Sequence, residues 1–301
     1  MQLLRLIETI RTPFLDTVMG LVTRLGEEAL ALAVLCLVFW CVNKRAAYVI
    51  GVAFFFSGLT VQCMKICFRT DRPWVTDPAL RPVPSALVNS TGYSFPSGHT
   101  QSAAALFGSL GAQAKRKAIK ALCFSAVAPV AFSRLYLGVH TLPDVAVSLL
   151  ITFALVWITT KVFTAENIDA TINKKREFIV SLIMTVFAAT VTVIAAVLYF
   201  NKAIEKNYVS DCAKAAGAGV AFAAGMFIER VYIGFPVKAK SIFRQCVKFA
   251  LGLAVTLAIK EGLKPLIGTG LIADMFRYFL MIAWVTVLFP MIIKRLARLK
   301  D

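Results

Sequence analysis

The sequence predicts an all-α, polytopic helical membrane protein. Of its 301 residues, 59% are hydrophobic and only 16% are charged, whereas a soluble domain usually has about 25% charged residues. Long apolar stretches, such as residues 177–200 and 272–293, each have about the length that crosses a bilayer as a helix. The composition therefore excludes an ordinary soluble domain.

About nine stretches have the length and composition of a transmembrane helix. They cover residues 28–42, 46–66, 99–114, 118–136, 142–162, 177–200, 211–228, 243–259 and 272–293. Residues 1–26 differ, because apolar side chains recur there at helical spacing with charges between them. We expect this stretch to form an N-terminal amphipathic helix in the membrane interface.

The basic residues predict the orientation of the chain in the membrane. The net charge is +17, and most Lys and Arg residues fall in alternate loops. These are Lys44-Arg45, Lys115-Arg116-Lys117 with Lys120, Lys174-Lys175-Arg176, Arg230 with Lys238 and Lys240, and Lys294-Arg295 with Arg298 and Lys300. The positive-inside tendency places them in the cytoplasm together with the C-terminus. The N-terminus and the loops at 67–98 and 137–141 are then outside, and no basic face remains to suggest a nucleic-acid partner.

The chain also divides into two blocks. Residues 1–165 contain about five of the expected spans and all the motifs described below, and residues 166–301 contain a four-helix bundle. A polar connector at 164–176 separates them. Small residues crowd the span at 211–228, which predicts close helix packing either within the chain or between two copies. The oligomeric state stays open.

Three motifs bring reactive side chains to the predicted outer face. They are Lys65-x6-Arg72-Pro73, Pro96-Ser97-Gly98-His99 and Ser133-Arg134-x5-His140-x3-Asp144. Together they contain both histidines of the chain, three cations, a hydroxyl and a carboxylate. That set of groups suits an enzyme that holds a phosphoryl group, attacks it and protonates its leaving group.

The first two motifs are suited to binding an anion. Lys65 and Arg72 can neutralise phosphate oxygens, although either cation can also be an ordinary interfacial residue. Ser97 and Gly98 precede an apolar run, so they are expected at a helix N-terminus, where free N–H groups favour an anion. His99 is then placed to protonate a departing oxygen. The alternative for this motif is a plain loop-to-helix junction with Ser97 as its cap.

The third motif pairs a histidine with a carboxylate. His140 and Asp144 are four residues apart, so on a helix they share a face. Asp144 can then hold one ring nitrogen of His140 and leave the other free to attack. A histidine at a helix start is often only a polar boundary residue, but an aspartate one turn into an apolar span is costly unless it has a function.

The three motifs, in this order, resemble the signature of the type-2 phosphatidic acid phosphatase superfamily over about residues 60–150. The resemblance implies that His140 forms a phosphohistidine, that Asp144 orients it, and that His99 acts as general acid and then as the base for water. It also implies phosphate-binding roles for five residues, namely Lys65, Arg72, Ser97, Gly98 and Arg134. It implies no metal and no cofactor.

The expected activity is that of a metal-independent phosphatase for a membrane lipid phosphate or pyrophosphate, such as undecaprenyl pyrophosphate, phosphatidic acid or phosphatidylglycerophosphate. The expected partners are this substrate and the bilayer, with the site on the extracytoplasmic face of an inner or plasma membrane. Three alternatives remain: a phosphatase for a soluble ester such as glucose 6-phosphate, a phosphotransferase, and a catalytically silent lipid transporter or scramblase. The soluble haloperoxidases of the superfamily fit this apolar chain least.

Overall fold

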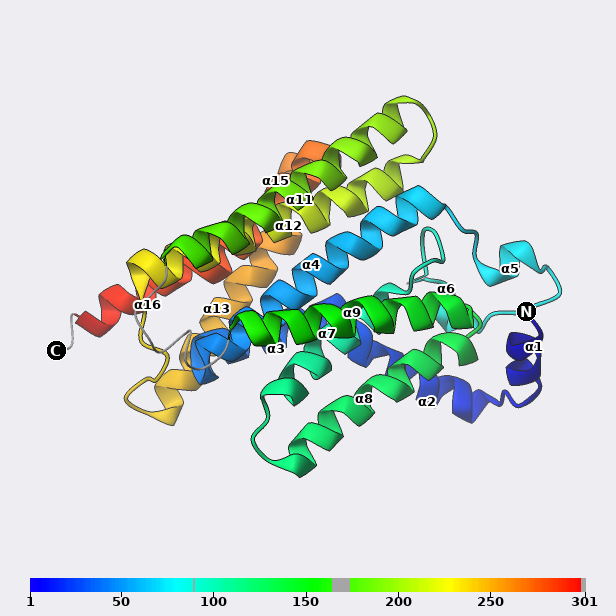
Figure 1. The fold of residues 1–301 in the computed structure, drawn as a ribbon, viewed down its shortest axis with the longest axis horizontal. Helices are drawn as coiled ribbons and strands as arrows, with labels where there is room; N and C mark the ends of the chain where they lie inside the picture. Colours follow the sequence, from blue (N-terminus) through cyan, green and yellow to red (C-terminus); the bar gives the residue numbers. More distant parts are fainter. Residues whose placement is uncertain (89, 164–173, 299–301) are drawn as a thin grey trace. The chain divides into compact units, whose positions relative to one another are not determined.

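The computed structural model describes residues 1–88, 90–163 and 174–298, and within these ranges it consists of helices and connecting loops without a strand (Figure 1). Seven of the described helices are long and apolar enough to cross a membrane. An eighth span results if the bent pair 13–26 and 28–42 is counted as one. The predicted fold class is confirmed, and the chain is a polytopic helical membrane protein.

Seven or eight of the about nine expected spans meet the length and composition of a transmembrane helix in the described residues. The helix α7, Gly98–Gln113, has only 16 residues and is rich in Ser, Gly and Gln, so it does not meet the length of a span. Residues 28–42 meet it only together with the helix before them. These two segments correspond to the two shortest of the expected spans, 28–42 and 99–114.

Contacts divide the chain into two compact units, which we describe separately. Unit 1 comprises Met1–Leu32 and Thr60–Thr160, and unit 2 comprises Ala33–Leu59 and Lys161–Asp301. Residues 33–59, expected in the first block, therefore belong to unit 2. The domain boundary at residue 165 stays a prediction, and residues 164–173 of the expected connector lie outside the described part of the chain.

Unit 1 contains ten helical elements, of which α3, α4 and α9 lie in it in part. These are α1 (Gln2–Thr9), α2 (Pro13–Thr23), η1 (Arg24–Gly26), the first half of α3 (Glu28–Leu37), the end of α4 (Lys44–Phe68), α5 (Pro73–Thr76), α6 (Pro84–Leu87), α7, α8 (Lys117–Tyr136) and α9 (Leu142–Val162). The N-terminal stretch expected as one helix is thus broken. Pro13 begins a new helix, and the Thr12 hydroxyl accepts a hydrogen bond from the Leu15 N–H as its cap.

A buried apolar cluster anchors the N-terminal helix and the turn after α8. Leu4 and Ile7 of α1 pack in it with Leu135 of α8 and with Leu137 and Val139 of the turn. The other face of α1 exposes apolar side chains, among them Leu3 and Leu6. The helix is amphipathic as expected, and its position at a membrane interface stays a prediction. The cluster fixes the turn that leads to His140.

Unit 2 contains the remaining helices. They are the end of α3, η2 (Val38–Val42), the start of α4, α11 (Lys174–Phe200), α12 (Lys206–Ile228), η3 (Glu229–Ile233), α13 (Ile242–Gly262), α14 (Lys264–Ile267), α15 (Leu271–Ala283), η4 (Trp284–Leu288) and α16 (Phe289–Arg298). The small residues of α12 allow the close packing that the sequence predicts. A Cβ at Gly217 would collide with the Met275 carbonyl, and one at Gly225 with the Thr286 side chain.

Candidate active site

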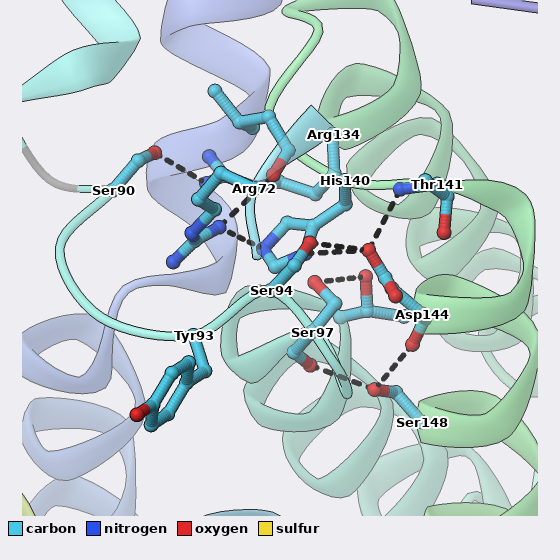
Figure 2. A network of polar contacts seen from close by, with 12 residues as sticks. Arg72, Ser90, Tyr93, Ser94, Ser97, Arg134, His140, Thr141, Asp144 and Ser148 are labelled. Carbon is cyan, nitrogen blue, oxygen red and sulfur yellow. Dashed lines mark hydrogen bonds and ion pairs between the residues drawn. The ribbon is translucent and has the colours of Figure 1, made fainter. Parts of the chain in front are cut away.

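All three motifs meet in unit 1, where the end of α4, the loop after it, the start of α7, the end of α8 and the start of α9 come together (Figure 2). The side chains at the centre are almost completely buried. Arg72 is 7% exposed, and Arg134, His140 and Asp144 are 1–2% exposed. Buried polar groups of this kind are costly unless each has a partner, so their contacts define the site.

His140 and Asp144 form the pair that their spacing predicts. The His140 Nδ1 atom lies 3.4 Å from Asp144 Oδ2. The same carboxylate oxygen accepts hydrogen bonds from the Ser94 hydroxyl at 2.6 Å and from the Thr141 N–H at 2.8 Å. Asp144 lies in the first turn of α9, where the helix dipole also favours a negative charge. The carboxylate is therefore held in position by contacts other than the one with the imidazole.

Arg72 holds the other side of the imidazole. Its NH1 atom is 3.0 Å from His140 Nε2. The guanidinium also donates to three backbone carbonyls, those of Gly92 at 2.8 Å, Val139 at 2.9 Å and Thr91 at 2.9 Å. A guanidinium has only donors, so Nε2 must accept, and the ring proton of a neutral His140 belongs on Nδ1, toward Asp144. This tautomer presents a lone pair at Nε2.

His140 is neutral at ordinary pH in this environment. It lies in the turn between α8 and α9, and its pKa is held well below its usual 6.5, first by burial and then by the charges of Arg72, Arg134 and Lys65. A neutral imidazole is the nucleophilic form. Burial and the neighbouring cations therefore keep the predicted nucleophile in its reactive state.

The start of α7 supplies backbone donors beside this pair. Ser97 is the N-cap residue of α7, without a side-chain capping bond. The first N–H groups of a helix have no partner within it. The Ser97 N–H donates to the Asp144 carbonyl at 3.1 Å, and the Ser148 hydroxyl bridges the carbonyls of Ser97 and Asp144, each at 2.9 Å. These bonds tie the helix start to the catalytic pair.

Gly98 borders open space. A Cβ built at Gly98 has no other atom within 4 Å, so the backbone is accessible there to an anion. The Ser97 side chain, by contrast, is fully buried and accepts a hydrogen bond from Thr100 at 3.0 Å. The Ser97 backbone lies at the helix start, as expected for an anion site. Direct phosphate binding by the Ser97 hydroxyl stays a prediction.

Arg134 approaches from the end of α8. Its NH1 donates to Thr23 at 2.7 Å and its NH2 to Ser90 at 3.2 Å. The Nε atom is buried and has no hydrogen-bond partner within the described chain. The Arg134 carbonyl accepts from the His140 N–H at 3.3 Å. Arg134 thus supports the turn that carries His140 through its backbone, and its Nε donor has no partner among the described residues.

Lys65 and His99 lie less directly in the network. The Lys65 ammonium donates to the Tyr93 carbonyl at 2.8 Å, which attaches α4 to the loop that carries Ser94. His99 is partly buried and lines a cavity together with Arg134. Its imidazole makes no hydrogen bond or ion pair with any residue that the structure describes. Its ring is therefore available to a substrate.

Three contacts in the network are absent from the sequence prediction, namely those of Ser94, Thr141 and Ser148. Ser148 follows Asp144 by four residues, so helical spacing already placed it on the same face. Ser94 and Thr141 lie in a loop and a turn, where spacing gives no such signal. In the described ranges, no group of three or more His, Cys, Asp or Glu side chains is arranged to hold a metal ion.

Comparisons with known proteins identify the family of the chain. A sequence profile of the PAP2 superfamily matches residues 45–168, and a profile for the transmembrane extension of PAP2 superfamily phosphatases matches residues 213–300. The second match corrects our expectation that the resemblance ends before the C-terminal bundle. No curated protein matches the chain significantly.

Two crystal structures are similar to part of the chain. LpxE from Aquifex aeolicus has 26% identity and a TM-score of 0.47, over 53% of this chain and 93% of that one. A transmembrane PAP2-type phosphatidylglycerolphosphate phosphatase from Bacillus subtilis has 25% identity and a TM-score of 0.44, over 53% of this chain and 82% of that one. The two profile matches together cover more than half of the sequence, and the chain belongs to the PAP2 superfamily as a membrane phosphatase.

Proposed function

We propose that the protein hydrolyses a phosphate or pyrophosphate ester of a membrane lipid through a phosphohistidine on His140, without a metal or cofactor. One observation carries the proposal. His140 is held between the Asp144 carboxylate at Nδ1 and the Arg72 guanidinium at Nε2. This arrangement fixes the ring, its tautomer and the direction of its lone pair, as a histidine nucleophile requires.

In the first step, the Arg72 N–H that binds His140 Nε2 in the empty site moves to a phosphate oxygen, which frees the Nε2 lone pair. Nε2 then attacks phosphorus, and the bond to the leaving oxygen breaks. That oxygen takes a proton from His99. The phosphorylated imidazole retains its Nδ1 proton and is therefore cationic, and the Asp144 carboxylate stabilises it. Arg72, Lys65, the Nε of Arg134 and the backbone at Gly98 neutralise the phosphate oxygens.

In the second step, His99 is neutral and takes a proton from water. The water oxygen attacks phosphorus, the phosphorus–nitrogen bond breaks, and inorganic phosphate leaves. His140 returns to its neutral form with the proton on Nδ1, and His99 is again protonated. Burial, and then the charges of Arg134, Lys65 and Arg72, lower the pKa of His99 in the empty site, so the bound phosphate anion helps to protonate it.

A lipid substrate and an extracytoplasmic site are part of the same proposal. The candidate spans and the family support a substrate in the bilayer. The positive-inside pattern supports a cytoplasmic C-terminus, with the N-terminus and the loops around the site outside an inner or plasma membrane. Undecaprenyl pyrophosphate, phosphatidic acid and phosphatidylglycerophosphate remain the candidate substrates.

The test is phosphate release by purified protein in EDTA, from a panel of lipid phosphates, lipid pyrophosphates and glucose 6-phosphate. We expect release from a lipid, loss of release in His140→Ala, and an acid-labile phosphoenzyme in the wild type. Release from glucose 6-phosphate alone would favour the soluble-ester alternative. Transfer of phosphate to an added alcohol in place of water would indicate a phosphotransferase.

The transporter alternative predicts a different result. A folded wild type that releases no phosphate from any of these compounds would contradict the proposal. A further control uses p-nitrophenyl phosphate, whose leaving group needs no proton. In the first turnover, His99→Ala should lose less activity with this ester than with an alkyl phosphate. His140→Ala should lose activity with both substrates.

A further inference from the structure

A cavity of about 280 Å³ with both polar and apolar walls lies beside His99 and Arg134. The rest of its wall comes from α2, η1, the residue after η1, α6 and the turn after α8, and its polar side chains there are Asp16, Thr17, Thr23, Arg24, Glu27 and Ser85. All of these residues belong to unit 1. His140 and Arg72 do not line it, so the cavity extends the site on the side of His99.

The position of the cavity relates it to the leaving group. In the proposed mechanism, on which this inference rests, His99 protonates the oxygen that departs from phosphorus. The group attached to that oxygen must then lie on the His99 side. A cavity lined by His99 and by Arg134, whose Nε is unpaired, is the place where this group meets the protein.

The charges of the wall exclude two kinds of occupant. Two carboxylates, Asp16 and Glu27, face two guanidiniums, Arg24 and Arg134, so the wall has no net charge when His99 is neutral. A second phosphate would lose to the two carboxylates what it gains from the two guanidiniums, so the wall does not favour it. A hydrocarbon chain would remove charged groups from water without offering them a partner, which is costly. A neutral group with several hydroxyls satisfies this wall best.

Two acceptors in the wall are available to such hydroxyls. Asp16 accepts from the Tyr136 hydroxyl at 2.9 Å through Oδ1, and its Oδ2 has no partner in the described part of the chain. The half-buried Glu27 carboxylate likewise has no hydrogen bond or ion pair with a described residue. The hydroxyls of Thr17 and Thr23 are already engaged, by the Pro13 carbonyl and by Arg134.

We propose that this cavity binds a hydroxyl-rich leaving group through the carboxylates of Asp16 and Glu27. Its volume is at the lower end of ligand pockets, which begin at about 300 Å³, and suits a glycerol unit or one sugar ring. The preferred substrate is then a phosphate monoester whose departing oxygen belongs to a polyol. A prenol or a diacylglycerol, which brings no free hydroxyl, is the poorer leaving group.

The experiment compares two lipids that share their acyl chains. In phosphatidylglycerophosphate the departing oxygen belongs to a glycerol with a free hydroxyl, and in phosphatidic acid it belongs to diacylglycerol. We expect the wild type to prefer the first in kcat/KM by about tenfold or more, because a hydrogen bond to a carboxylate has about that effect. Glu27→Ala and Asp16→Asn should reduce the preference and leave the rate with phosphatidic acid within about twofold.

Glu28→Gln is the matched control, because Glu28 is the neighbouring carboxylate and does not line the cavity. It should leave both rates unchanged. Glycerol 3-phosphate and glucose 6-phosphate, assayed in parallel, distinguish a soluble polyol phosphate from a lipid-linked one. If the protein hydrolyses these soluble esters and Glu27→Ala weakens their hydrolysis, the cavity recognises the polyol in the same way, but in a soluble substrate.

Two results would overturn the inference. One is His140-dependent hydrolysis with no preference for the hydroxylated substrate; the other is an equal loss on both lipids in Glu27→Ala and Asp16→Asn. Either would leave the proposed function intact. The absence of phosphate release from every substrate by folded wild type would overturn both the inference and the proposed function.

Discussion

Replacing Asp144 with asparagine removes one negative charge from the centre of the site and changes little else. The amide oxygen of asparagine can occupy the place of Oδ2, where it still accepts from the Ser94 hydroxyl and the Thr141 N–H. We therefore expect Asp144→Asn to fold with nearly the wild-type Tm. The lost function is the stabilisation of the cationic phosphoimidazole at His140.

The size of that loss follows from the separation of the two groups. Nδ1 and Oδ2 lie 3.4 Å apart, and both side chains are 2% exposed. Two unit charges at this distance attract by about 5 kcal/mol at an effective dielectric constant of about 20. Because about 1.4 kcal/mol corresponds to a tenfold change in rate, phosphoenzyme formation should slow by roughly a thousandfold to ten-thousandfold.

The assay measures phosphoenzyme formation in a single turnover, with radiolabelled substrate and quenching in alkaline detergent, which preserves the acid-labile phosphohistidine, next to steady-state phosphate release. Asp71→Asn is the matched control, since Asp71 is an exposed carboxylate next to Arg72, in the loop after α4. A rate for Asp144→Asn within tenfold of wild type, or equal to that of Asp71→Asn, would refute the assignment of Asp144 as the partner of a cationic intermediate.

Three further results are expected. Gly98→Ala should leave Tm unchanged, because its Cβ meets no atom within 4 Å. The methyl group would occupy the space of the phosphate, so inhibition by the phosphate analogue vanadate and kcat/KM should both weaken by about tenfold or more. Equal vanadate inhibition of the wild type and the variant would contradict this. Gly26→Ala places a Cβ 2.6 Å from the His99 carbonyl oxygen, so both Tm and activity should fall, while Gly262→Ala, in open space, should change neither. In the pH profile of kcat/KM, the fall in activity on the acid side should lie below pH 6.5. The reason is that burial and the neighbouring cations lower the pKa of His140, so the neutral nucleophile persists as the pH falls. A fall that begins above pH 6.5 would argue against His140 as the nucleophile.

The motifs were predictable from the sequence because their spacing is local. His140 and Asp144 are four residues apart and meet although His140 lies in the turn before α9 and not on the helix itself, and Ser97-Gly98 precedes an apolar run that had to start a helix. The contact of Arg72 with His140 spans 68 residues, and no periodicity encodes it. Only the chemistry of the residue types suggested that these two belong together.

The parts that the sequence did not predict depend on tertiary contacts. The N-terminal stretch had helical periodicity throughout, but Pro13 divides it, and η1 brings Gly26 against the backbone of His99. The short helix α7 is mostly buried although it is rich in small and polar residues, because protein surrounds it. A hydropathy pattern cannot distinguish burial in protein from burial in lipid.

The way Arg72 is held has a consequence for how the protein can change. Its three carbonyl partners belong to Thr91, Gly92 and Val139, and a main-chain carbonyl is present whichever side chain a residue carries. Substitutions in the loop therefore leave the cation at the nucleophile in place, provided that the backbone keeps its path. Substrate preference can then diversify in this loop, by mutation or in a designed library, while the phosphoryl-transfer chemistry stays the same.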